Sequence, residues 1–161
     1  MKRMILAAAL AFAMPAHAAP GLTEHQTMVV GCLEQMENGT TWGQCVNLMF
    51  SPCAAEAVGS DGHVACLTTQ RDSWRETKDG LQRALIPLLT VAGGTEMVNL
   101  MGQWTGYVGQ KCAEVGRQNT TTGAEAAVLG CEISELSGIT VEFAACHDQI
   151  STAPYCVHED K

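Results

Sequence analysis

The residues of this sequence with the widest range of possible chemistry are its eight cysteines. They are Cys32, Cys45, Cys53, Cys66, Cys112, Cys131, Cys146 and Cys156. A cysteine can act as a redox centre, bind a metal as a thiolate, or form a disulfide. A thioredoxin-like redox site is disfavoured because the chain contains no Cys-x-x-Cys motif.

A structural zinc site is a competing interpretation, because cysteine and histidine lie close together at three places. These are His63-x-x-Cys66, Cys146-His147 and Cys156-x-His158. Zinc is held by thiolates and neutral imidazoles, so the choice between zinc and disulfides depends on the redox compartment of the protein.

The first eighteen residues indicate that compartment. Lys2 and Arg3 form a basic start, residues 4–14 are apolar, and Ala16-His17-Ala18 is a small-x-small cleavage site. This pattern is typical of a bacterial signal peptide. We therefore expect a leader over residues 1–18, cleavage near Ala18, and a periplasmic or secreted protein formed by residues 19–161.

An oxidising compartment favours disulfides over thiolate ligands. We expect all eight cysteines to form four disulfides, with no metal and no other cofactor. Two local pairs are suggested by position. Cys112 and Cys131 face each other across one loop, and Cys146 and Cys156 bracket the start of the C-terminal tail.

The sequence contains no recognisable catalytic motif. It lacks the Gly-x-Ser-x-Gly elbow, the His-Glu-x-x-His zinc motif, a phosphate-binding glycine loop and a dinucleotide-binding fingerprint. Its acidic residues are scattered, and a pair such as Glu132 and Glu135 is more typical of a solvated helix face than of a glycosidase. We expect a protein that is not an enzyme.

The net charge of the chain limits the classes of partner that it can bind. Without residues 1–18 it has 7 Lys and Arg against 17 Asp and Glu, a formal net charge of −10. Such a surface disfavours nucleic acid and anionic lipid. We expect no stable membrane anchor, because no segment after the leader is long and apolar enough to span a bilayer. The acidity serves solubility and also suits a basic protein partner.

The elements that must position these residues are helices. Apolar residues recur at helical spacing within about 23–37, 63–90, 96–115 and 124–145, with a short helix at 45–50. Pro87 is expected to shorten the second long helix, Gly93-Gly94 to break the chain, Thr95 to cap the next helix, and Gly116 to end it. The prediction is one all-α domain of about four long antiparallel helices stapled by disulfides.

The order of cysteines and aromatic residues resembles the LprI-like lysozyme inhibitor family, which consists of small exported helical proteins of bacteria. The likeness covers roughly residues 32–143 and rests on one pattern. It is Cys45, Cys53, Cys66 and Trp74, then Trp104-x-x-Tyr107-x-x-x-x-Cys112, then Cys131. The resemblance implies that Trp74, Trp104 and Tyr107 are structural motif residues and that the partner is a basic lysozyme-type protein.

The chain departs from the family at positions where the family carries polar residues along these helices. They are Gln70, Arg75, Lys78, Asp79, Met101, Val108 and Gly109. The resemblance therefore supports inhibition of lysozyme less directly than it supports fold and export.

The alternative function is an envelope interaction or structural module with no inhibitory activity. A third hypothesis is a small-molecule carrier, suggested by Met97 and Met101, although methionine commonly fills cores. Loops at 59–62 and 119–123 are candidates for an inhibitory anchor.

Overall fold

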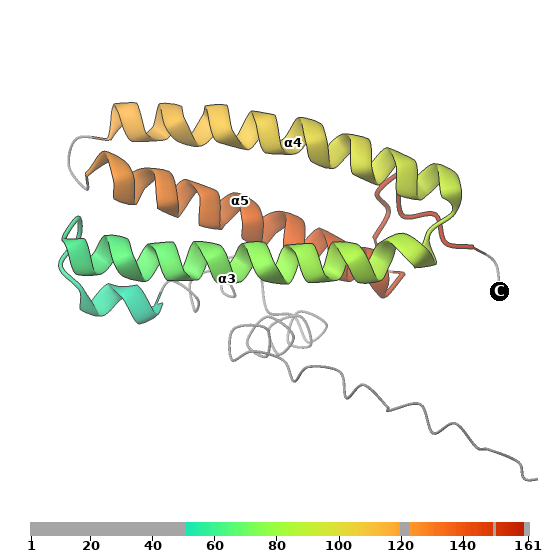
Figure 1. Cartoon of the computed structure of the whole chain (residues 1–161), viewed down its shortest axis with the longest axis horizontal. Helices are drawn as coiled ribbons and strands as arrows, with labels where there is room; N and C mark the ends of the chain where they lie inside the picture. The colour runs from blue at the N-terminus through green and yellow to red at the C-terminus, as the bar shows by residue number, and fades with distance from the viewer. Residues whose placement is uncertain (1–50, 120–122, 150, 160–161) are drawn as a thin grey trace, which may run out of the picture.

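A computed structural model describes residues 51–119, 123–149 and 151–159, and three long helices dominate this part of the chain (Figure 1). The elements in order are η1 (Ser51–Ala55), α3 (Asp61–Leu85), η2 (Ile86–Leu88), α4 (Val91–Gln118) and α5 (Ala124–His147). Consecutive long helices run in opposite directions, which confirms the predicted all-α fold of antiparallel helices. The helices expected at 23–37 and 45–50 lie outside the described residues.

Helix α5 lies between α3 and α4 and packs against both (Figure 1). The sequence of α5 explains its central place, because apolar and small residues occur all around it rather than on one stripe. A helix of this kind is stable only when it is covered on several sides. Its buried residues include Leu129, Ile133, Leu136 and Phe143.

The start and end of α3 follow local chemistry. The Ser60 side chain accepts a hydrogen bond from the His63 N–H at 3.2 Å, and Asp61 lies in the first turn near the positive end of the helix dipole. The α-helix ends at Leu85, and Pro87 lies in the short 3-10 turn that follows. The expectation that Pro87 shortens this helix is confirmed.

The predicted break at Gly93-Gly94 is wrong. Helix α4 begins at Val91, and Thr90 rather than Thr95 is its cap, with its hydroxyl accepting from the Gly93 N–H at 3.2 Å. Gly93 is needed for a different reason. A Cβ at this position would lie 2.6 Å from the carbonyl oxygen of Tyr155, so glycine lets the C-terminal tail approach the helix.

The predicted end at Gly116 is also wrong, because α4 continues to Gln118. Gly116 is buried inside the helix. A Cβ there would lie 2.5 Å from Cγ2 of Val128, so the absence of a side chain allows the end of α4 to approach the start of α5. Both glycines mark close packing that sequence periodicity does not reveal.

The core has two clusters. One joins η1, α3 and the first half of α5 around the fully buried Trp74. The other joins the second half of α5, the start of α4 and the C-terminal tail around Leu85, Met97 and Phe143. Trp104 packs against both clusters and connects them.

Three disulfides hold these elements together. Cys53–Cys66 ties η1 to α3, Cys112–Cys131 ties α4 to α5, and Cys146–Cys156 ties the tail to the end of α5. The last two are the local pairs that the sequence suggests. Cys32 and Cys45, for which a fourth disulfide is predicted, lie outside the described residues.

Candidate functional site

Disulfide formation decides against the zinc interpretation at the cysteines concerned. Cys66, Cys146 and Cys156 are all disulfide-bonded, so they provide no thiolate. The neighbouring histidines have structural contacts. Nδ1 of His63 accepts from the Gly59 N–H at 3.2 Å, and Nε2 of His158 lies 2.7 Å from the Cys146 carbonyl. Within the described ranges, no three His, Cys, Asp or Glu residues are arranged to hold a metal ion.

The three aromatic residues highlighted by the resemblance have different environments. Trp74 is fully buried between α3 and α5, and Trp104 is partly buried between the two core clusters. Tyr107 is 59% exposed, although it belongs to the apolar pattern within residues 96–115. The reason is that the buried side of α4 is narrow, and Val108 rather than its neighbour Tyr107 points into the core.

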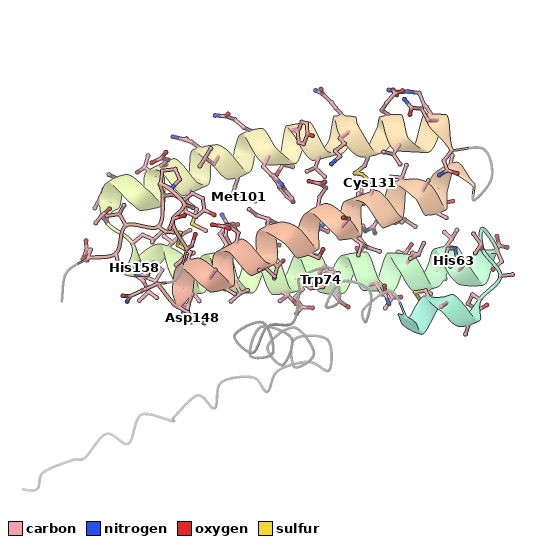
Figure 2. The ribbon with its side chains drawn as sticks, turned by 180° about the vertical axis from the view of Figure 1, so that it is seen from behind. His63, Trp74, Met101, Cys131, Asp148 and His158 are labelled. Atoms are coloured by element: carbon pink, nitrogen blue, oxygen red, sulfur yellow. A yellow bond between two sulfur atoms is a disulfide. The ribbon has the colours of Figure 1, made fainter. Side chains whose placement is uncertain are left out.

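An apolar pocket of about 500 Å³ opens between α4, α5 and the C-terminal tail. Helix α4 contributes Met97, Leu100 and Met101, and Trp104 and Tyr107 extend the same wall. The opposite walls are formed by α5 and the tail, with Ile139, Phe143, Ala153 and Tyr155. Figure 2 shows Met101 toward the end of the molecule that carries the tail with His158. The pocket therefore lies over the second core cluster.

Polar side chains distinguish this pocket from a simple gap in the core: Gln103 on α4, and Tyr155 and Glu142 on the opposite walls. The ring of Tyr155 packs edge-on against Phe143, with 6.4 Å between centroids, and its hydroxyl has no hydrogen-bond partner among the described residues. Burial, with a smaller contribution from the charge of Glu142, raises the pKa of Tyr155 to about 12. The hydroxyl thus remains a donor at neutral pH. Glu142 also lines the pocket and accepts a short hydrogen bond from Ser151.

A second groove of about 310 Å³, with charged and apolar walls, crosses from α3 to α4 over α5. Five of the seven positions at which the chain differs from the family that it resembles in sequence line this groove: Arg75, Lys78, Asp79, Val108 and Gly109. Trp104 separates this mixed groove from the apolar pocket, since it lines both. The other two departures lie elsewhere. Gln70 is buried in α3, and Met101 lines the apolar pocket.

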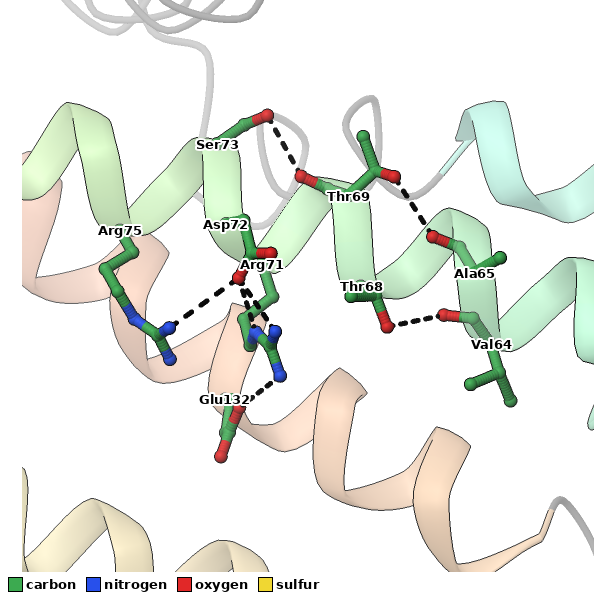
Figure 3. Close-up of polar contacts among 9 residues, drawn as sticks. All are labelled: Val64, Ala65, Thr68, Thr69, Arg71, Asp72, Ser73, Arg75 and Glu132. Atoms are coloured by element: carbon green, nitrogen blue, oxygen red, sulfur yellow. Dashed lines mark hydrogen bonds and ion pairs between the residues drawn. The ribbon is translucent and has the colours of Figure 1, made fainter.

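Charged side chains in and beside the mixed groove form ion pairs with one another. Nζ of Lys78 lies 2.5 Å from the Asp79 carboxylate, and Arg71 lies 3.7 Å from Glu132 on α5 (Figure 3). Figure 3 also shows that Thr68, Thr69 and Ser73 donate to carbonyls one turn back in their own helix. Each of these hydroxyls therefore donates its hydrogen bond within the helix.

Residues 59–62 lie at the same end of the molecule as the end of α4 and the start of α5, which flank the second loop (Figure 1). At this end Glu56 and Asp61 flank η1 and the start of α3, and Glu125 lies in the first turn of α5. All three carboxylates are exposed and have no ion pair within the described ranges, and Val58 beside them is 67% exposed. We refer to Glu56, Val58, Asp61 and Glu125 as the acidic tip. Residues 120–122 of the second loop lie outside the described residues.

The basic residue in the last turn of α4 does not neutralise the acidic tip, because it is already paired. Arg117 donates two hydrogen bonds to Glu114, and Gln118 donates a third at 2.7 Å. Arg117 and then Gln118 hold the pKa of Glu114 below its usual value. Farther along α4, Lys111 forms a 2.6 Å ion pair with Glu135 of α5. The hydrogen bond and charge of Glu135 raise the pKa of Lys111.

Sequence reasoning missed Tyr155, Glu142 and the mixed groove. Tyr155 and Glu142 belong to a tail and a helix that the Cys146–Cys156 disulfide joins. The predicted Cys146–Cys156 pair was the available signal, since it returns the tail to α5. In the part of the chain that the structure describes, no helix has the length and hydropathy needed to cross a membrane. Comparison of the chain with protein-family models, curated proteins and solved structures found no match.

Proposed function

We propose that this chain is an exported protein without enzymatic activity that inhibits a basic lysozyme-type enzyme, and that it docks through its acidic tip. Three lines of support combine. The cysteine and aromatic pattern resembles the LprI-like lysozyme inhibitor family, three disulfides fit an oxidising compartment, and the chain after the leader carries a net charge of −10.

The observation that carries the docking proposal is that no side-chain cation pairs with the carboxylates of the tip in the described residues, although Asp61 and Glu125 lie at the positive ends of the α3 and α5 dipoles. Glu56, Asp61 and Glu125 have no cation paired with them in the described residues, and other carboxylates nearby, such as Glu114, are paired. Exposed carboxylates without a paired side-chain cation attract a basic partner over a distance and orient it on approach. The exposed side chain of Val58 provides an apolar contact within this ring of charge.

A tight inhibitor also needs a binding surface that is rigid before the complex forms. The Cys53–Cys66 disulfide fixes η1 against α3, and Cys112–Cys131 fixes the C-terminal half of α4 against α5. Both disulfides lie toward the half of the molecule that carries the tip, as His63 and Cys131 in Figure 2 indicate. A surface fixed before binding loses less conformational entropy when the complex forms.

The tip is tested by neutralising it and comparing the result with an equal change elsewhere. The tip variant carries Glu56→Gln, Asp61→Asn and Glu125→Gln. The control carries Glu96→Gln, Asp148→Asn and Glu159→Gln, which are exposed and lie toward the opposite end of the helices. Both variants have the same net charge, so a difference between them reports on position.

We expect the tip variant to bind a basic lysozyme about tenfold more weakly than the wild type, since exposed ion pairs contribute roughly 0.2–1 kcal/mol each. The control should lose about twofold or less. Interferometry at low and high salt measures both, and the wild-type association rate should fall as salt rises. Equal losses in the two variants would remove the tip from the proposal, and undetectable wild-type binding to several lysozymes would remove the proposal itself.

A second candidate is an envelope interaction module that binds a partner without inhibiting it. This candidate is favoured by the mixed groove, which is lined by five of the seven positions at which the chain differs from the family that it resembles. The polar residues of that family are replaced together in this groove. The two functions differ in one outcome. A module of this kind forms a complex with lysozyme or with another envelope protein and leaves the rate of lysis unchanged.

A further inference from the structure

We propose that the apolar pocket between α4, α5 and the C-terminal tail binds an uncharged apolar small molecule that carries one hydrogen-bond acceptor, such as a long-chain alcohol, and that Tyr155 donates the hydrogen bond. The pocket lies on a different part of the molecule from the acidic tip, so this site does not rest on lysozyme binding. Its volume of about 500 Å³ falls in the range of roughly 300–1,000 Å³ that is usual for ligand pockets.

The hydroxyl of Tyr155 is the observation that points to a ligand. Tyr155 is only 7% exposed and lines the pocket, yet its hydroxyl has no hydrogen-bond partner among the described residues. A buried donor without a partner is destabilising by about 1–3 kcal/mol and is uncommon in native proteins. The oxygen is covered by neighbouring atoms, so an acceptor on a bound molecule removes this penalty when a side chain of the lining moves aside to expose the hydroxyl. Because the pKa of Tyr155 is raised to about 12, the hydroxyl is protonated and able to donate throughout the physiological range.

The charges around the pocket select the ligand further. Glu142 is the only ionisable carboxylate in the described lining, and no lysine, arginine or histidine lines it. A fatty-acid carboxylate is therefore repelled and finds no cation to pair with. An ammonium group is attracted by Glu142 but leaves the Tyr155 donor unsatisfied, because an ammonium group accepts no hydrogen bond. An uncharged hydrogen-bond acceptor is not repelled by Glu142 and can accept the hydrogen bond of Tyr155.

The apolar lining suits a flexible hydrocarbon chain. Met97 and Met101 are unbranched and polarizable, so they adapt to ligands of different shape. Leu100 and Tyr107 are partly exposed at 38% and 59%, which places them where a ligand can enter from solvent. The methionines that suggest a carrier in the sequence are buried members of the second core cluster, and they form the floor of the pocket where it meets that core.

The test uses the oxidised protein with its signal peptide removed and the fluorescent apolar amine N-phenyl-naphthylamine. Dodecanol, dodecanoate and dodecylammonium, which share one hydrocarbon chain, compete for the bound dye. We expect dodecanol to displace it at a concentration at least tenfold below that of dodecanoate and below that of dodecylammonium. Absence of dye binding, or displacement by dodecanoate at the same concentration as dodecanol, overturns the proposal.

Two variants connect the binding to this pocket. Leu100→Gln makes its wall polar, whereas Val98→Gln makes the same change on α4 at a residue outside the lining and 53% exposed. We expect the first to weaken dye binding at least fivefold and the second to leave it within twofold. Similar behaviour of the two variants contradicts binding in this pocket.

Tyr155→Phe tests the hydrogen bond. The change removes a hydroxyl that has no partner in the described residues, so the melting temperature of the free protein should stay the same or rise. The affinity for dodecanol should fall about fivefold, because a typical hydrogen bond contributes roughly 0.5–1.5 kcal/mol. An unchanged dodecanol affinity removes Tyr155 as the donor. A purely structural role for the hydroxyl is indicated by a lower melting temperature together with unchanged affinity.

Discussion

Replacing Trp74 with alanine is expected to lower the free energy of unfolding by about 3–5 kcal/mol. Trp74 is fully buried and lies in the cluster that joins α3 to α5, with Leu67, Leu129 and Ile133 among its members. Removing the indole leaves a cavity between two helices whose backbones are restrained by the surrounding packing. Denaturation with urea under oxidising conditions, followed by near-ultraviolet circular dichroism, measures the loss.

Tyr107→Ala is the matched control, because the resemblance treats both aromatic residues as structural. Tyr107 is 59% exposed, and its recorded ring contact is with the Lys111 ammonium, 5.9 Å from the ring centroid. An exposed contact of this kind contributes about 0.5–1 kcal/mol. We therefore expect a loss below about 1 kcal/mol. Comparable losses in the two variants would contradict the placement of Tyr107 on the surface of α4.

Reduction of the disulfides is expected to unfold the domain at physiological temperature. The described residues contain three bridges, each of which typically stabilises a domain by about 2–4 kcal/mol. Their combined contribution is comparable with the total stability of an ordinary domain, about 5–15 kcal/mol. The three bridges also tie η1, the end of α4 and the tail to the helices beside them.

The measurement is thermal unfolding of the protein treated with reduced dithiothreitol, with oxidised dithiothreitol as the control. We expect the cooperative transition to move down by tens of degrees or to disappear in the reduced sample only. Peptide mapping of the oxidised protein should show no free thiol, including at Cys32 and Cys45. A reduced protein that melts within a few degrees of the oxidised one would show that packing alone maintains this fold.

The sequence predicts most of the helical framework because local signals determine it. Pro87 acts on the residues beside it, and the 124–145 pattern lies within α5 as observed. The Ser60 cap of α3 was not predicted, because residues 59–62 were interpreted as a loop. The pairs Cys112–Cys131 and Cys146–Cys156 were also within reach, since each closes one short segment. These features depend on chain neighbours, so periodicity and spacing are sufficient to find them.

Features that depend on packing between distant segments could not be predicted in this way. Gly93 was interpreted as a helix breaker, but its role is to admit the Tyr155 carbonyl from the tail. Tyr107 fits a helical apolar pattern, yet the narrow contact of α4 with α5 leaves it exposed. The apolar pocket forms from α4, α5 and the tail together, so neither its volume nor the unpaired Tyr155 hydroxyl is visible in any one segment.

The same distinction applies to the candidate docking surface. The sequence identifies two loops that could hold an anchor, but only the fold places the residues that flank them at one end of the molecule. Glu56, Asp61 and Glu125 are separated along the chain. They lie at the same end of the fold because η1 is bonded to α3 and packs beside the start of α5. Their lack of paired cations is likewise a property of the fold.

The most direct test of the proposed function is the rate at which lysozyme clears a suspension of bacterial cell walls in the presence of the oxidised protein. With a basic lysozyme and micromolar protein, we predict at least a twofold reduction in the initial rate of clearing. The tip variant should inhibit less than the control variant of equal charge. An unchanged rate of clearing across several types of lysozyme, with protein that is folded and fully oxidised, would contradict the inhibitor proposal.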